Sequence, residues 1–177
     1  NIAGTYTITY SASDASQNTG YATRIVNVVD TTAPVVTVTG DNPATVELGA
    51  TYTDAGATTN EGTVSSSGTV DTSTVGTYTI TYTATDASGN TSTATRIVNV
   101  ADSVAPVITV AGANPAVTEL GRAYDINTSN AGATASDLSG DITVVVTGSV
   151  DVTKVGANTI TYTATDASGN TSTATRI

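Results

Sequence analysis

Apolar residues alternate with threonine along several short stretches of the chain. Between residues 78 and 84, Tyr78, Ile80, Tyr82 and Ala84 occupy one parity, while threonines occupy the other. A period of two is typical of a β-strand that buries one face, and β-branched threonine suits the exposed face. The same alternation predicts further strands at residues 36–38, 46–48 and 94–100, and Arg96 interrupts the last of them.

Turn-forming residues separate these stretches. Asp, Asn, Gly and Pro gather at residues 40–43, 54–56 and 86–90, where such residues supply positive φ angles or cap the turn. Few stretches show helical periodicity. We therefore predict an all-β fold, in which about seven short strands in each stretch of roughly 75 residues form a two-sheet sandwich of the immunoglobulin type.

The alternating pattern is repeated along the chain. Residues 76–90 recur at 156–170 and, with changes, at 4–18. The Ala-Pro pairs at 33–34 and 105–106 are spaced by about 72 residues, which indicates tandem modules like beads on a string. We predict that residues 1–30 are the C-terminal strands of a truncated module, 31–102 a complete module, and 103–177 a module lacking the end of its last strand. We expect the native protein to continue in both directions.

The composition excludes several classes of function. The chain has no cysteine and no histidine, so thiolate metal centres, disulfides and histidine-activated nucleophiles are excluded. Five basic residues stand against fifteen acidic ones, with a net charge of −10, which does not suit a nucleic-acid partner. No apolar run approaches the roughly 18 residues of a membrane span, so we expect no membrane insertion of this segment.

Several motifs together resemble a known class of surface modules. They are Thr32-Ala33-Pro34 and residues 46–49, 52–57, 76–82 and 86–90. In these motifs the chain resembles the bacterial immunoglobulin-like repeats of large cell-surface proteins. Those repeats are similar to hyalin-repeat modules and to accessory domains of some pesticidal crystal toxins. The resemblance implies an extracellular, bacterial or archaeal, repeat-built stalk, since such modules mostly act as spacers in adhesins, surface fibres and extracellular enzymes.

The loop at residues 86–90, Asp-Ala-Ser-Gly-Asn, has two interpretations. In the first it is a hairpin turn, in which Asp86 caps the backbone and Gly89 adopts a positive φ. In the second its oxygen atoms bind Ca²⁺, which prefers several oxygen ligands.

The expected topology predicts where a calcium site would lie. In an immunoglobulin-type sandwich this F–G loop lies at the N-terminal end of its module, near the preceding linker, so acidic groups could converge at the inter-module joints. Acids dispersed for solubility are the competing interpretation, and no cofactor is otherwise required. The candidate calcium ligands are Asp30, Asp86 and Asn90 at the first joint, and Asp41, Asn42, Asp71, Asp102, Asp137, Asp141, Asp166 and Asn170 at the second.

Other recurring charged residues receive structural interpretations. Glu47 and Glu119 stand at matching positions, and any ion pair with Arg96 or Arg176 would be a weak surface pair. The arginines at 24, 96 and 176 are expected to pack their aliphatic stems along a sheet face.

Two kinds of covalent modification can be assessed from single residues. Lys154 is the only lysine, and its counterpart in the preceding repeat is Thr74, which argues against an intramolecular isopeptide bond. Asn90, Asn127 and Asn170 head Asn-x-Ser/Thr sequons and are candidate glycosylation sites.

Three functions remain open at this point. The first is a structural spacer in an extracellular adhesin or fibre. The second is recognition of a glycan or protein through loops, with the enlarged region at residues 123–147 as the candidate. The third is a polymeric filament of identical chains assembled by strand exchange, because residues 1–30 hold only two strands whose edges need cover. We expect no enzymatic activity, since no pocket is marked and the chain lacks Trp and Phe platforms for a sugar.

Overall fold

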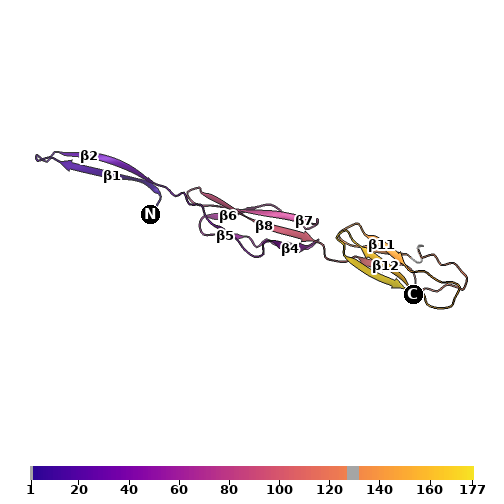
Figure 1. Ribbon diagram of the computed structural model, residues 1–177. Coiled ribbons are helices and arrows are strands. Elements are labelled where there is room, and N and C mark those ends of the chain that lie inside the picture. The colour runs from indigo at the N-terminus through magenta and orange to yellow at the C-terminus, as the bar shows by residue number, and fades with distance from the viewer. Residues whose placement is uncertain (1, 127–131) are drawn as a thin grey trace. The chain divides into compact units, whose positions relative to one another are not determined.

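The protein is described by a computed structural model that covers residues 2–126 and 132–177 (Figure 1). Within these residues there are thirteen strands and no helix, which confirms the predicted all-β fold. Accordingly, this part of the chain contains no helix that could span a membrane. The strands are β1 (Gly4–Ser13), β2 (Thr19–Val28), β3 (Val36–Val38), β4 (Ala44–Glu47), β5 (Ala57–Thr59), β6 (Thr63–Ser67), β7 (Gly76–Thr85), β8 (Thr91–Ala101), β9 (Val107–Val110), β10 (Ala133–Ser136), β11 (Thr143–Thr147), β12 (Ile160–Thr165) and β13 (Thr171–Arg176).

The first two strands form an isolated hairpin. β1 and β2 pair antiparallel from Gly4 opposite Val28 to Ser13 opposite Thr19, and they pair with no other strand of the described residues. The alternating side chains of Tyr6, Ile8 and Tyr10 are therefore exposed. A two-stranded hairpin is marginally stable in water on its own.

The central repeat, residues 31–102, contains two sheets. One has the strand order β4-β8-β7-β6, and the other is the pair β3-β5. β4 runs parallel to β8, with Ala44 opposite Val98 and Glu47 opposite Ala101. The pairings of β3 with β5 and of β6 with β7 are antiparallel. Six strands form here instead of about seven, because residues 48–56 and 68–75 are turns and irregular segments.

The hydrophobic core follows the period of two that the sequence displays. In β7, Ile80, Tyr82 and Ala84 are buried, while the threonines between them are half-buried. Leu48 and the valines of β8 complete this set of buried side chains. Tyr78 donates a hydrogen bond of 2.9 Å to the carbonyl oxygen of Thr74, which is the bond expected of a tyrosine corner.

The C-terminal repeat, residues 103–177, has the pair β9-β10 and the three-stranded sheet β11-β12-β13. Ile160, Tyr162 and Ala164 of β12 are buried, as is Pro106. Asn158 occupies the position of the corner tyrosine, and its Oδ1 accepts the N–H of Asp151 at 3.1 Å. A side-chain amide thus replaces the phenol in tying this turn.

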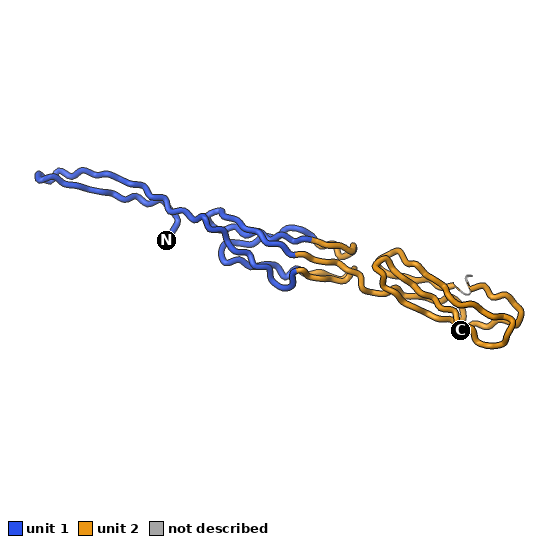
Figure 2. The backbone as a smooth tube through the Cα atoms, viewed as in Figure 1, with its two compact units in different colours: residues 1–42, 54–69, 79–96 blue, residues 43–53, 70–78, 97–177 orange. Residues whose placement is uncertain are grey.

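The chain packs as two compact units (Figure 2). One comprises residues 1–42, 54–69 and 79–96, and the other comprises residues 43–53, 70–78 and 97–177. β7 and β8 each run through both units. The units cut across the sequence repeats, so the module boundaries at residues 30/31 and 102/103 stay a prediction.

Candidate functional site

The loop at residues 86–90 is a capped hairpin turn. Oδ1 of the buried Asp86 accepts the N–H groups of Ser88 and Asn90 at 2.9 and 2.8 Å, and its Oδ2 accepts the Asn90 amide at 2.8 Å. Gly89 has a φ of +87°, which a residue without a Cβ adopts at no steric penalty. The hydrogen bonds from Asn90 and from the backbone lower the pKa of Asp86. The turn interpretation of this loop is confirmed.

The equivalent loop of the C-terminal repeat is built in the same way. Asn170 donates its backbone N–H to Oδ1 of Asp166 at 2.8 Å and its side-chain amide to Oδ2 at 2.9 Å. Burial of Asp166 raises its pKa, but the hydrogen bonds from Asn170 and the backbone outweigh this effect, so the pKa is lowered. The carboxylate is therefore kept in its ionised form.

Both loops hold the segment that precedes their repeat. The Asn90 amide donates to the carbonyl oxygen of Asp30 at 3.2 Å. The Asn170 amide donates to the carbonyl oxygen of Asp102 at 3.1 Å. We call each of these contacts a linker clasp, and it lies where the sequence placed the F–G loop, beside the preceding linker.

Two groups of three carboxylates gather at the clasps. In each group, one oxygen from every residue lies within 4.8 Å of the other two. Glu61 was not among the residues predicted from the sequence. It lies in the loop between β5 and β6, as Asp137 lies in the loop between β10 and β11 of the next repeat. The groups are Asp30, Glu61 and Asp86 in the first case, and Asp102, Asp137 and Asp166 in the second.

The second group contains an unpartnered carboxylate oxygen. Oδ1 of Asp102 accepts the N–H of Val104 at 3.2 Å. Its Oδ2 has an accessible surface below 1 Å² and accepts no hydrogen bond from the described residues. Asp137 uses its Oδ1 to accept the N–H of Ser139 at 2.9 Å.

Three of the predicted carboxylate ligands, Asp41, Asp71 and the exposed Asp141, lie outside these groups. Asn42 also lies outside them, and its side-chain amide donates to the carbonyl oxygen of Thr95 at 2.8 Å. Asp41 is exposed, and its carbonyl oxygen accepts the Nη1 of Arg96 at 3.1 Å. Asp71 caps its own turn, where Oδ1 accepts both the N–H and the hydroxyl of Ser73 at 3.0 and 2.6 Å. These hydrogen bonds lower the pKa of Asp71, the hydroxyl bond having the largest effect.

The arginine of the central repeat is buried, which corrects the surface interpretation. Arg96 is 2% exposed, and its Nε lies 3.2 Å from Oδ1 of Asp54 and 3.1 Å from the Tyr82 hydroxyl. The guanidinium also donates to the carbonyl oxygens of Thr39, Asp41 and Gly56. Arg176 is buried as well, whereas Arg24 in the hairpin is exposed.

Within residues 2–126 and 132–177, Glu47 forms no ion pair with an arginine. Its carboxylate accepts the N–H and the hydroxyl of Ser103 at 2.8 and 2.6 Å. These two bonds, the hydroxyl bond first, lower the pKa of Glu47. Glu119, at the matching position of the C-terminal repeat, is exposed.

Two of the candidate glycosylation sites are already engaged in hydrogen bonds. The side-chain nitrogens of Asn90 and Asn170 each donate two hydrogen bonds in their linker clasps. Attachment of a glycan would displace at least one of them. Asn127 lies outside the described residues, and glycosylation stays a prediction.

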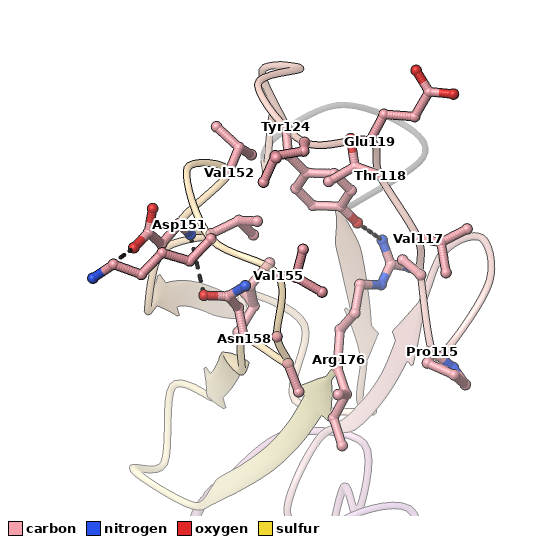
Figure 3. Close-up of a pocket in the computed structure, with 18 residues that line it drawn as sticks. Pro115, Val117, Thr118, Glu119, Tyr124, Asp151, Val152, Val155, Asn158 and Arg176 are labelled. Atoms are coloured by element: carbon pink, nitrogen blue, oxygen red, sulfur yellow. Dashed lines mark hydrogen bonds and ion pairs between the residues drawn. The ribbon is translucent and has the colours of Figure 1, made fainter.

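A groove of about 360 Å³ opens between residues 115–124 and residues 150–160 of the C-terminal repeat (Figure 3). Arg176 and Tyr124 point toward one another in it, with Nη1 3.3 Å from the hydroxyl. Its apolar rim is exposed: Val117 is 94%, Leu120 65% and Val155 93% accessible.

The central repeat shows what fills the equivalent space. There, residues 98–101 of β8 pair with β4, and the Leu48 N–H donates to the Ala101 carbonyl at 2.8 Å. Leu48 is consequently buried, whereas its counterpart Leu120 is exposed. The groove therefore occupies the place that residues 98–101 of β8 take in the central repeat.

Known proteins match this chain in sequence. The family described as "Bacterial surface protein, Ig-like domain" matches residues 36–100 and 108–177. Hyalin of Strongylocentrotus purpuratus is 34% identical over 94% of the chain, and hyalin of Lytechinus variegatus is 36% identical over 95%. The chain spans only 15% and 35% of the lengths of these two relatives. A protocadherin gammaB7 EC3-6 cis-dimer structure aligns over 97% of the chain and 56% of its own, with a TM-score of 0.38 and 18% identity.

Proposed function

Since this chain belongs to the Ig-like domain family of bacterial surface proteins, we propose that it is a spacer segment of a large extracellular surface protein. In this role its repeats separate an outer functional part from the surface of a bacterial or archaeal cell. The role requires neither catalysis nor a cofactor. Its immediate partners are neighbouring repeats of the same polypeptide.

The observation that carries this proposal is the recurrence of the linker clasp. In both repeats an asparagine of the F–G loop holds the carbonyl oxygen of the residue just before the repeat. Each clasp removes rotational freedom from a short linker. A chain whose linkers are individually fastened resists folding back on itself, which is the property a spacer needs.

The surface chemistry supports the same role. Alternating threonines cover the outer faces of the strands, so these faces are hydrophilic without being highly charged. The net charge of −10 keeps parallel chains apart and soluble.

The proposal is tested by adding further copies of residues 31–102 to the chain. Small-angle X-ray scattering should show the maximum dimension increasing by a constant increment with each copy. Asn90→Ala with Asn170→Ala should reduce that increment, because the linkers are released. Asn18→Ala is the matched control, since Asn18 makes the same two bonds to Asp14 within its own loop and lies outside the added copies of residues 31–102. A dimension that stops growing with copy number would overturn the spacer role.

A polymeric filament assembled by strand exchange is the second candidate function. Residues 25–28 of β2 and residues 97–100 of β8 share the sequence Ile-Val-Asn-Val. The groove of the C-terminal repeat lies where β8 pairs with β4 in the central repeat, and it is the proposed slot for β2 of a second copy.

Sedimentation of the chain at increasing concentration tests strand exchange. Oligomers should form, and extending the chain after Ile177 by Val-Asn-Val-Ala-Asp should abolish them by filling the slot internally. A chain that stays monomeric at every concentration, with or without the extension, would exclude the filament.

Recognition of a glycan or protein through residues 123–147 also stays a proposal. Five of these residues, 127–131, lie outside the described part of the chain. Unchanged binding on a glycan array after this region is shortened would reject it as the site.

A further inference from the structure

We propose that Asp102, Asp137 and Asp166 bind one Ca²⁺ ion, an inference that deepens the proposed spacer function and rests on it. The three carboxylates come from separate segments. Asp102 follows β8, Asp137 follows β10 and Asp166 follows β12, so all three stand just beyond the C-terminal end of a strand.

The first argument is electrostatic. One oxygen of each carboxylate lies within 4.8 Å of the other two, and like charges at such distances repel one another strongly where water is partly excluded. Asp102 and Asp137 are half-buried and Asp166 is buried. The three carboxylates therefore lie together in a place that is partly shielded from water, and a cation would offset their mutual repulsion.

The second argument is independent of the charge count. Oδ2 of Asp102 is buried and accepts no hydrogen bond from the described residues. A carboxylate oxygen that is removed from water without a donor is strongly unfavourable. A cation at this group supplies the missing interaction, which no N–H or O–H of residues 2–126 and 132–177 provides.

The ligand chemistry selects calcium. The three residues offer oxygen atoms only, which are the ligands of hard cations, and the chain contains no histidine or cysteine that would favour zinc. Ca²⁺ binds oxygens at about 2.3–2.6 Å, so two of its ligands are never more than about 5 Å apart. The 4.8 Å limit on the three oxygens satisfies that condition. Water completes the coordination shell.

The ion would fasten three elements to one point. β10 belongs to the pair β9-β10, and β12 belongs to the sheet β11-β12-β13. An ion held by Asp102, Asp137 and Asp166 therefore ties the segment after β8 to both sheets of the C-terminal repeat, and it reinforces the Asn170 clasp. The group of Asp30, Glu61 and Asp86 is excluded from the proposal, because no buried unpartnered oxygen marks it among the described residues.

Isothermal titration calorimetry of the full chain with CaCl₂ tests the site. We expect a dissociation constant of about 0.1–1 mM, the range of extracellular calcium modules. The melting temperature should rise by about 5–10 °C when Ca²⁺ exceeds that constant a hundredfold. The test variant is Asp102→Asn with Asp137→Asn, in which each asparagine keeps the oxygen that accepts a backbone N–H. This variant should bind Ca²⁺ at least tenfold more weakly and should not gain stability from it.

The control variant is Asp41→Asn with Asp71→Asn, which removes the same charge from two exposed acids outside the group. It should bind Ca²⁺ as the parent does. Equal losses in both variants would mean general screening of charge and would overturn the site, as would a parent chain without binding heat. Tighter binding of Mg²⁺ than of Ca²⁺ would overturn the choice of ion. A failed calcium titration leaves the length increment per copy unaffected, so the spacer role is judged separately.

Discussion

Replacing Arg96 by methionine tests whether the buried guanidinium network stabilises the central repeat. The chain contains a matched pair for this experiment. Residues 22–28 and 94–100 share the sequence Ala-Thr-Arg-Ile-Val-Asn-Val, yet Arg24 is exposed and Arg96 is 2% exposed. The same substitution can therefore be made in two environments with identical local sequence.

The expected difference follows from the contacts of Arg96. Removing the guanidinium leaves Asp54 without this cation, the Tyr82 hydroxyl without one of its contacts, and three backbone carbonyls without these donors. Breaking a buried pair by removing one member costs about 3–5 kcal/mol. Arg24→Met, at an exposed position, should change the free energy of unfolding by less than about 0.5 kcal/mol.

Urea unfolding followed by far-UV circular dichroism measures both values. Arg96→Met with Asp54→Leu should recover part of the loss, because the uncompensated carboxylate is then absent. Similar changes for Arg24→Met and Arg96→Met, or a loss below about 1 kcal/mol for Arg96→Met, would refute this account of the network.

Three further results are expected. Urea unfolding should show that Gly62→Ala destabilises the chain more than Gly89→Ala. Both residues have a positive φ, but only at Gly62 would a Cβ lie 2.1 Å from a backbone oxygen, that of Thr85. Equal losses of stability would contradict this steric argument. Tyr78→Phe should cost about 1 kcal/mol in the same assay, the value of one hydrogen bond, and an unchanged midpoint would show that the bond to Thr74 is dispensable. The pKa of Asp86 is lower in the folded chain, so its contribution to stability is present above the pKa of the unfolded state and is lost as the pH falls through the folded value. Thermal melts between pH 7 and pH 2 should show that loss, and Asp86→Asn should reduce it.

The strands were predictable because their signal is local. The alternation at residues 78–84 lies within β7, and residues 94–100 lie within β8. The turn at residues 86–90 was equally predictable, since Asp at its start is a residue type that caps a turn and Gly at its fourth position is one that adopts a positive φ. Periodicity and turn chemistry depend on residues that are neighbours in the sequence, so one sequence is enough to reveal them.

The buried network was missed because its members are distant in sequence. Arg96 meets Asp54 and Tyr82 only after the two sheets assemble. One signal was available: Arg96 shares the parity of Val98 and Val100, which are buried, so its side chain had to enter the same face. A charged residue that stands on the apolar face of a strand therefore indicates a buried polar network, and not only an interruption of the alternating pattern.

The acidic groups were predicted in part for the same reason. The F–G loop could be placed beside the preceding linker from the expected topology alone. Which further acids reach it depends on the remaining loops, so Glu61 was overlooked and Asp41 and Asp71 were included. Loop conformation, unlike strand parity, has no simple period that a sequence reveals.

The parallel pairing of β4 with β8 has a mechanical consequence. β4 lies near the entry of the central repeat and β8 at its exit, and they share a ladder from Ala44–Val98 to Glu47–Ala101. When the chain is pulled from its two ends, parallel neighbours are drawn in opposite directions along their common axis. The hydrogen bonds of the ladder are then loaded together in shear instead of being opened one after another, so this short ladder is the element that sets how much tension the repeat withstands.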